Sequence, residues 1–306
     1  MFNTKNEFWK KVQSNIIFIA FTELLIYNVG LLIVYSVRAM FDPFTPLVGE
    51  KFGMYYNLYF WIIIPIIMTL VFMKLTCRRA LRVFTEGSFK KKLGSWATGF
   101  ALGFLCIAIL DFVGYLSGTM TIVLGRFNWR ILPMLPLVFI QSSAEEMLLR
   151  GYVPAVMKEK HSWDTICFVS GTLFIFHHIL NMIYSGFETL FCLNIFLMGV
   201  LYCLYVEWAG NFWISSGAHT GWNYTLLCLI GPGEKDDFPG IIGGTARSNS
   251  WFYSKTSGFQ GTVATAVLLT VLVLLMIYTL HVRAKSQTGP GDGTQASIID
   301  DYADIS

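Results

Sequence analysis

The sequence predicts an all-α, polytopic membrane protein with about eight transmembrane helices. The first observation is composition: 55% of the 306 residues are hydrophobic and only 13% are charged. A soluble domain of this length cannot bury that much apolar surface, so lipid must cover the remainder. The second observation is that apolar runs of roughly 20 residues, enough for a helix to cross about 30 Å of hydrocarbon, recur along the chain. We expect spans near residues 14–36, 56–74, 95–122, 131–150, 164–184, 189–208, 211–231 and 260–282.

Lys and Arg gather in three segments beside these spans. The loop after the second span, from Lys74 to Lys92, is the most basic, and the N-terminus and the residues after the last span are the other two. Because basic loops stay on the cytoplasmic side, we expect both termini there, which an even number of spans allows. With no organellar signal in view, we expect an integral protein of a bacterial cell membrane.

The small net charge of +3 is concentrated in these loops, which favours a lipid bilayer as partner and argues against nucleic acid. We expect residues 1–285 to form a single transmembrane helical domain. The segment 286–306 is polar and Gly-rich, and we expect it to be a disordered tail.

A few polar side chains interrupt the apolar runs, although a charge at the centre of a span costs roughly 2.5 to 3.5 kcal/mol. They lie on several helices, and one shared interior site would keep all of them out of lipid. They are Glu145, Glu146 and Arg150 in span 131–150, His177, His178 and Asn181 in span 164–184, His219 and Asn223 in span 211–231, and Asp111 in span 95–122.

Helical spacing divides the first of these groups. Glu146 and Arg150 are four residues apart with the acid first, which is the favourable order for an ion pair within a helix. Glu145 is rotated by about 100° from Glu146, so it is free to face another partner.

The same spacing orients the histidines. Phe174 and His178 share one helix face, whereas His177 points away from it. His219 and Asn223 are one turn apart on a separate helix. We therefore expect Glu145, His178, His219 and Asn223 to converge, with His177 outside the cluster.

Three short motifs in this order resemble those of the CPBP family of membrane proteins. "EEMLLR", "FIFHHILN" and "HTGWN" are similar to the family motifs EExxxR, FxxxH and HxxxN, and they lie within a motif core at residues 142–223. The family comprises the CAAX prenyl endopeptidases and the Abi-type bacterial proteins linked to bacteriocin processing and immunity. The resemblance implies an intramembrane endopeptidase that cleaves a peptide or a membrane protein.

The residue types also suit amide hydrolysis, which needs an activated water, donors for the oxyanion and a proton for the leaving amine. Glu145 can act as general base while His178 holds the water. His219 and Asn223 can donate hydrogen bonds to the oxyanion, and the Glu146 pair would orient the other groups. The predicted catalytic set is Glu145, Glu146, Arg150, His178, His219 and Asn223.

Two alternatives remain open. Glu145, His178 and His219 also make a His₂Glu set of the kind that holds catalytic zinc. We favour a mechanism without a cofactor, because Asn223 is a poor zinc ligand but a good oxyanion donor. The second alternative is a non-enzymatic membrane protein, an immunity factor or a transporter, that uses the same polar cluster for binding. Asp111 supports it, whereas the lack of an internal repeat argues against a transporter.

Overall fold

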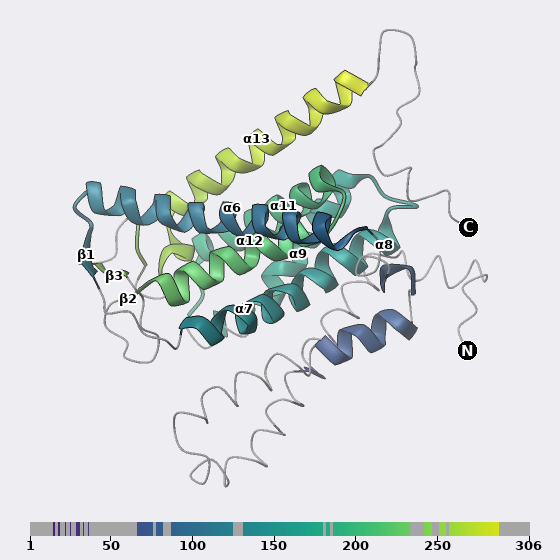
Figure 1. The fold of residues 1–306 in the computed structure, drawn as a ribbon, viewed down its shortest axis with the longest axis horizontal. Coiled ribbons are helices and arrows are strands. Elements are labelled where there is room, and N and C mark those ends of the chain that lie inside the picture. The colour runs from purple at the N-terminus through teal and green to yellow at the C-terminus, as the bar shows by residue number, and fades with distance from the viewer. Residues whose placement is uncertain are drawn as a thin grey trace.

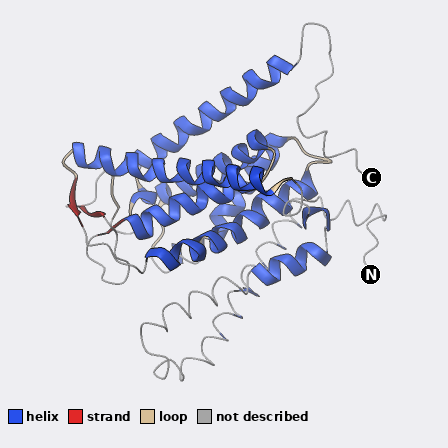
Figure 2. Cartoon of the chain, viewed as in Figure 1, coloured by secondary structure: helices blue, strands red, loops and turns tan. Residues whose placement is uncertain are grey.

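The computed structural model gives the chain a mainly helical fold, as predicted (Figures 1 and 2). The predicted span 14–36 lies largely outside the described residues, and the predicted tail does so from residue 288 onward. The second half of the predicted span 56–74 is described and forms the apolar helix Ile66–Leu75. The described residues are 66–75, 78–81, 87–124, 131–179, 182–183, 186–232, 242–246, 251–254 and 257–287, with scattered positions between 15 and 36.

Each of the six predicted spans from residue 95 onward contains a helix. The α-helices are α6 (Phe89–Leu116), α7 (Ile131–Glu146), α8 (Val153–Met157), α9 (Trp163–His177), α11 (Thr189–Ala209), α12 (Trp213–Tyr224) and α13 (Val263–Gln287). Two π-helical segments continue α7 and α12, at Met147–Tyr152 and Thr225–Leu229. Short 3₁₀ turns occur at Arg78–Leu81 and Phe259–Gly261.

Capping residues explain several helix ends. The Ser88 hydroxyl accepts a hydrogen bond from the Lys91 backbone N–H at 3.3 Å, so α6 begins six residues before the apolar run alone suggests. Ser162 caps α9 in the same way. Helix α11 ends at Gly210, whose φ of 66° lies in the left-handed region that favours glycine.

Among the residues that the structure describes, three helices are long and apolar enough to cross a membrane: α6, α11 and α13. Helices α9 and α12 contain 15 and 12 residues, which is less than the roughly 20 that a span requires. On α13, large apolar side chains such as Leu274 and Tyr278 are 60% and 67% exposed, as a lipid-facing surface requires. The protein is therefore an integral membrane protein, and the predicted count of about eight spans is not confirmed among the described residues.

Helices α6 and α12 run side by side in backbone contact (Figure 1). A Cβ added at Gly99 or Gly103 of α6 would collide with main-chain atoms of α12, and one added at Gly217 or Gly221 of α12 would collide with main-chain atoms of α6. Gly99 and Gly103, four residues apart on α6, therefore let the two helices approach closely. This contact fixes the position of α12, which carries two of the predicted site residues.

A small sheet lies at the end of the bundle where α6 and α12 finish, and it is an addition to the predicted all-α fold (Figure 2). Its strands are β1 (Met120–Leu124), β2 (Ile230–Pro232) and β3 (Ile242–Ala246), in the order β1-β3-β2. Strand β3 pairs antiparallel with β1 and parallel with β2. Strand β1 occupies the end of the predicted span 95–122. Just before β1, Gly114 of α6 faces Met120, and Gly118 turns the chain with a φ of 70°.

Candidate active site

A buried ion pair lies where α7 passes into its π-helical continuation. Arg150 Nη1 donates to Glu146 Oε1 at 3.0 Å, and both side chains are fully buried. The Nη2 group of Arg150 donates to the Gly199 carbonyl of α11 at 2.9 Å. The ion pair predicted from the four-residue spacing is thus confirmed. π-Helical segments often occur at functional sites, and this one begins directly after Glu146.

Aromatic rings and a close helix contact enclose the Arg150 guanidinium. Its central carbon lies 4.8 Å from the ring centroid of Phe174 and 5.5 Å from that of Tyr202. A Cβ added at Gly199 would lie 2.7 Å from the Gly171 Cα and 3.3 Å from Arg150 Nη2. Helices α9 and α11 therefore approach closely at two glycines, which brings Phe174 and the Gly199 carbonyl onto Arg150.

His219 of α12 connects the two glutamates. Its Nδ1 is 3.1 Å from Glu146 Oε1, and its Nε2 faces Glu145 Oε2 at 4.0 Å. The imidazole packs between Phe174 and Tyr202, each with its ring centroid 5.6 Å away. A carboxylate at Nδ1 favours the tautomer in which Nδ1–H donates, which leaves Nε2 directed at Glu145.

Gln141, which the sequence analysis does not single out, joins Glu145 to Asn223. Its amide Nε2 donates to Glu145 Oε1, and its Oε1 accepts from Asn223 Nδ2 at 3.3 Å. Gln141 lies four residues before Glu145, one turn away on the same helix face, and this spacing is the signal that could have found it. The network brings α7 and α12 together at the site.

The two adjacent histidines lie at the end of α9. His178 directly follows the helix, and its Nδ1 is 3.0 Å from the Phe174 carbonyl oxygen, so Nδ1–H donates and Nε2 is left as an acceptor. The Phe174 ring contacts both His178 and His219. Phe174 thus lies beside both histidines of the predicted cluster, and the convergence of His178 on Glu145 stays a prediction.

His177 is only 4% exposed, so it lies in the protein interior. Its exclusion from the cluster stays a prediction. Asn181 lies outside the described residues.

The described residues contain no group of three His, Cys, Asp or Glu side chains placed to hold a metal ion. Asp111 is 6% exposed on α6, and its Oδ2 is buried without a hydrogen-bond partner among the described residues. It forms no described hydrogen bond or ion pair with the six predicted site residues.

Comparison with known families is informative for the central part of the chain. Residues 126–225 match the family model described as type II CAAX prenyl endopeptidase Rce1-like, and this region contains all three motifs. Comparisons with curated proteins and with solved structures found no match. The family match supports an intramembrane protease of the CAAX type. Over residues 126–225, the chain is similar to the CAAX endopeptidases of the CPBP family, and the resemblance carried by the three motifs is confirmed.

Proposed function

We propose that this protein is an intramembrane endopeptidase that uses Glu145 to activate water. The observation that carries the proposal is the pair of facing atoms, Glu145 Oε2 and His219 Nε2, which lie 4.0 Å apart. Glu145 Oε2 is buried and has no hydrogen-bond partner among the described residues. A water about 2.8 Å from each atom would bridge them, since a polar separation of this size suits one water.

In the proposed reaction, Glu145 takes a proton from this water as its oxygen attacks the substrate carbonyl carbon. The second hydrogen of this water is donated to His178 Nε2, and its oxygen accepts from the Nε2–H of protonated His219. Asn223 Nδ2 donates to the oxyanion, and so does His219 Nε2 when the imidazole is protonated and the Glu146 carboxylate offsets its charge. The proton then passes from Glu145 to the leaving amine nitrogen, and the C–N bond breaks.

Glu146 and Arg150 act in this scheme through His219. Glu146 Oε1 holds the Nδ1 side of the imidazole, and Arg150 Nη1 donates to the same oxygen and so fixes the carboxylate. The arrangement resembles other sites in which a buried carboxylate sets the tautomer and orientation of a histidine. The two neighbouring glutamates would therefore have different roles: Glu145 accepts the proton of the water, and Glu146 orients His219.

The proposed substrate is a peptide or membrane protein that reaches the site from the cytoplasmic side or the inner leaflet. This orientation follows from the basic loops, which would place both termini in the cytoplasm of a bacterial cell. Glu145 lies near the C-terminal end of α7, where the helix continues through the π-helical segment Met147–Tyr152 into α8. A role in processing bacteriocin-like peptides belongs to the same proposal.

The direct test is a cleavage assay with purified, reconstituted protein and a set of membrane-associated peptides. New termini identified by mass spectrometry would support an endopeptidase, provided that Glu145→Gln protein produces none. The second candidate, a non-enzymatic binding or transport protein, rests on the buried Asp111 carboxylate, whose Oδ2 has no hydrogen-bond partner among the described residues. It predicts no cleavage of any peptide and full biological function in the Glu145→Gln variant.

Chelation separates the proposed mechanism from the zinc alternative. We expect the protein to keep its cleavage activity after exhaustive treatment with a strong zinc chelator, because water activation is assigned to Glu145. Activity is measured before chelation, after it and after zinc is added back. Complete loss that zinc restores would instead establish Glu145, His178 and His219 as zinc ligands.

Replacing Gln141 tests whether it orients the site. We expect Gln141→Ala to lower kcat by up to about 10²-fold with little change in KM, because a small misplacement of Glu145 and Asn223 slows the chemical step. The matched control is Ser143→Ala on the same helix, which removes the 2.7 Å hydrogen bond to Ser216 without touching Glu145. Equal losses in the two variants would show that Gln141 contributes only helix packing.

A further inference from the structure

Tyr202 of α11 contacts both partners of Glu146, although it belongs to none of the three motifs. Its ring centroid lies 5.6 Å from that of His219 and 5.5 Å from the central carbon of Arg150. The motif residue Phe174 makes the same two contacts, at 5.6 Å and 4.8 Å. The centroids of the two rings are 6.4 Å apart. Phe174 and Tyr202 therefore form an aromatic clamp on the imidazole and the guanidinium.

The two rings of the aromatic clamp meet the imidazole at different angles. The Phe174 ring meets it edge to face, with 80° between the ring planes, whereas the Tyr202 ring is tilted by only 32°. Both centroid separations fall within the range of about 4.5–7 Å that is typical of favourable aromatic pairs. An aromatic ring face also attracts a cation within about 6 Å. The Tyr202 ring therefore restrains rotation of His219 and favours a positive charge on both partners of Glu146.

Helix α11 holds Arg150 through two contacts from one face. The Gly199 carbonyl, three residues before Tyr202, accepts a hydrogen bond from Arg150 Nη2 at 2.9 Å. Tyr202 itself is only 3% exposed, so the protein interior covers it almost completely. Its hydroxyl is buried and has no hydrogen-bond partner among the described residues. The described contacts of Tyr202 with the site thus come from its ring and not from its hydroxyl.

We propose that Tyr202 is a positioning residue that holds the His219 imidazole at the angle at which it meets the water and Glu145. The inference rests on the proposed function, because it gives Tyr202 a role in the reaction of that site. Tyr202 touches no reacting atom in the scheme, so its ring acts through His219 and Arg150. Loss of the ring should therefore slow the chemical step and leave substrate binding unchanged, because a small misplacement of a catalytic group is costly.

The first test measures kcat and KM of Tyr202→Leu and Tyr202→Phe in the reconstituted cleavage assay. We expect Tyr202→Leu to lower kcat by about 10- to 100-fold with KM unchanged, because the imidazole is no longer held in place. Tyr202→Phe should keep kcat within about two-fold of the unaltered protein, because it retains the ring that makes both contacts.

Tyr205 supplies the matched control on the same helix. It is 4% exposed, and among the described residues its ring pairs with Tyr202 but not with His219 or Arg150. Tyr205→Leu should lower the melting temperature about as much as Tyr202→Leu, because each variant loses a buried aromatic ring. Its kcat should fall much less.

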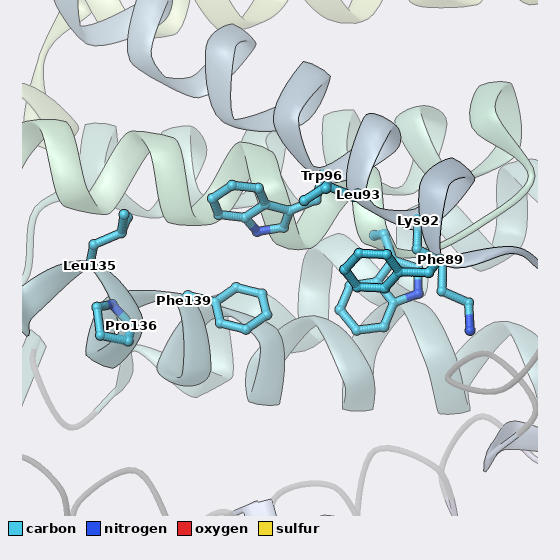
Figure 3. A pocket seen from close by; sticks show the side chains of 8 residues that line it. Phe89, Lys92, Leu93, Trp96, Leu135, Pro136 and Phe139 are labelled. Atoms are coloured by element: carbon cyan, nitrogen blue, oxygen red, sulfur yellow. The ribbon is translucent and has the colours of Figure 1, made fainter.

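A second control removes an aromatic contact elsewhere on a helix of the site. Phe139 of α7 meets Trp96 of α6 edge to face, with centroids 5.6 Å apart, in the wall of an apolar groove (Figure 3). Among the described residues, its ring pairs with Trp96 and Trp213 but not with His219. Phe139→Leu should therefore keep kcat within about two-fold of the unaltered protein, although α7 also carries Glu145.

A spectroscopic measurement separates this inference from the proposed function. In protein with isotope-labelled histidine, the ring signal of His219 is assigned from its loss in His219→Gln. We expect one sharp signal in the unaltered protein and in Tyr202→Phe, and a broadened or doubled signal in Tyr202→Leu, because the imidazole can then rotate. If these spectra are found but the unaltered protein cleaves no peptide, the aromatic clamp stands and the proposed function fails.

The inference is overturned by any of three results. Equal losses of kcat in Tyr202→Leu and Tyr205→Leu would show that Tyr202 contributes only helix packing. A large loss of kcat in Tyr202→Phe would assign the role to the hydroxyl instead of the ring. An unchanged His219 signal in Tyr202→Leu would show that the ring does not restrain the imidazole.

Discussion

Glu145→Gln is expected to abolish peptide cleavage while leaving the protein folded. Glutamine has nearly the same shape but cannot accept the proton of the attacking water, and loss of a general base costs at least about 10²–10⁴-fold in rate. The side chain is 15% exposed and its nearest described partner is the neutral Gln141 amide, so the substitution breaks no ion pair with Arg or Lys. Cleavage rate and melting temperature in detergent are measured together.

Glu146→Gln is expected to behave differently, because it leaves Arg150 buried without its counter-ion. Breaking a buried pair in this way costs roughly 3 to 5 kcal/mol. It also removes the charge at His219 Nδ1, so activity should fall as well. Adding Arg150→Gln to this variant should recover part of the stability but little of the activity. If Glu146→Gln proves stable and inactive while Glu145→Gln is unstable, the roles of the two glutamates are reversed.

Gly99→Ala is expected to destabilise the protein strongly by separating α6 from α12. The new methyl group would collide with the Ile214 carbonyl and lie 2.8 Å from the Ala218 nitrogen, and main-chain atoms cannot move aside as a flexible side chain does. Overpacking typically costs 1–3 kcal/mol, and we expect at least about that here. Activity should fall too, because α12 carries His219 and Asn223.

Helix α6 supplies its own control for this experiment. A Cβ added at Gly94 meets no atom within 4 Å, so Gly94→Ala should be neutral or stabilising by up to about 1 kcal/mol. Gly217→Ala, from the other side of the contact, should match Gly99→Ala. Melting temperatures and denaturant midpoints of all three variants test the contact. Equal stability of the Gly94 and Gly99 variants would contradict it.

The sequence predicts those parts of the fold that depend on local pattern. The run 189–208 anticipates α11, Thr189–Ala209, to within one residue, because a buried apolar helix and an apolar run have the same length. The run 164–184 overestimates α9, which ends at His177, because hydropathy does not locate helix ends. The sheet was not foreseen. Its pairing of Met120 with Ala246 joins distant segments, and β3 is too Gly-rich to resemble a strand.

The same division holds for the candidate site. The Glu146 and Arg150 pair could be predicted because four residues of one helix set its geometry. The bond between Glu146 and His219 depends on how α7 and α12 pack, which no local spacing reveals. The sequence alone did not single out Gln141, because an amide one turn before a charged motif looks like an ordinary polar residue at the boundary of a membrane span. The buried position of His177 likewise depends on the helices around α9.

The shared use of Glu146 also has a consequence for biosynthesis. Arg150 follows it by four residues, but His219 follows by 73, so the ribosome completes α7 well before α12 exists. At 5–20 residues per second, that interval lasts roughly 4 to 15 s. Throughout this time the newly synthesised α7 carries an ion pair that no other helix covers yet. Its transfer into lipid is therefore unfavourable. Stable insertion of α7 must therefore wait for α12, or depend on a chaperone that retains polar helices at the insertion site.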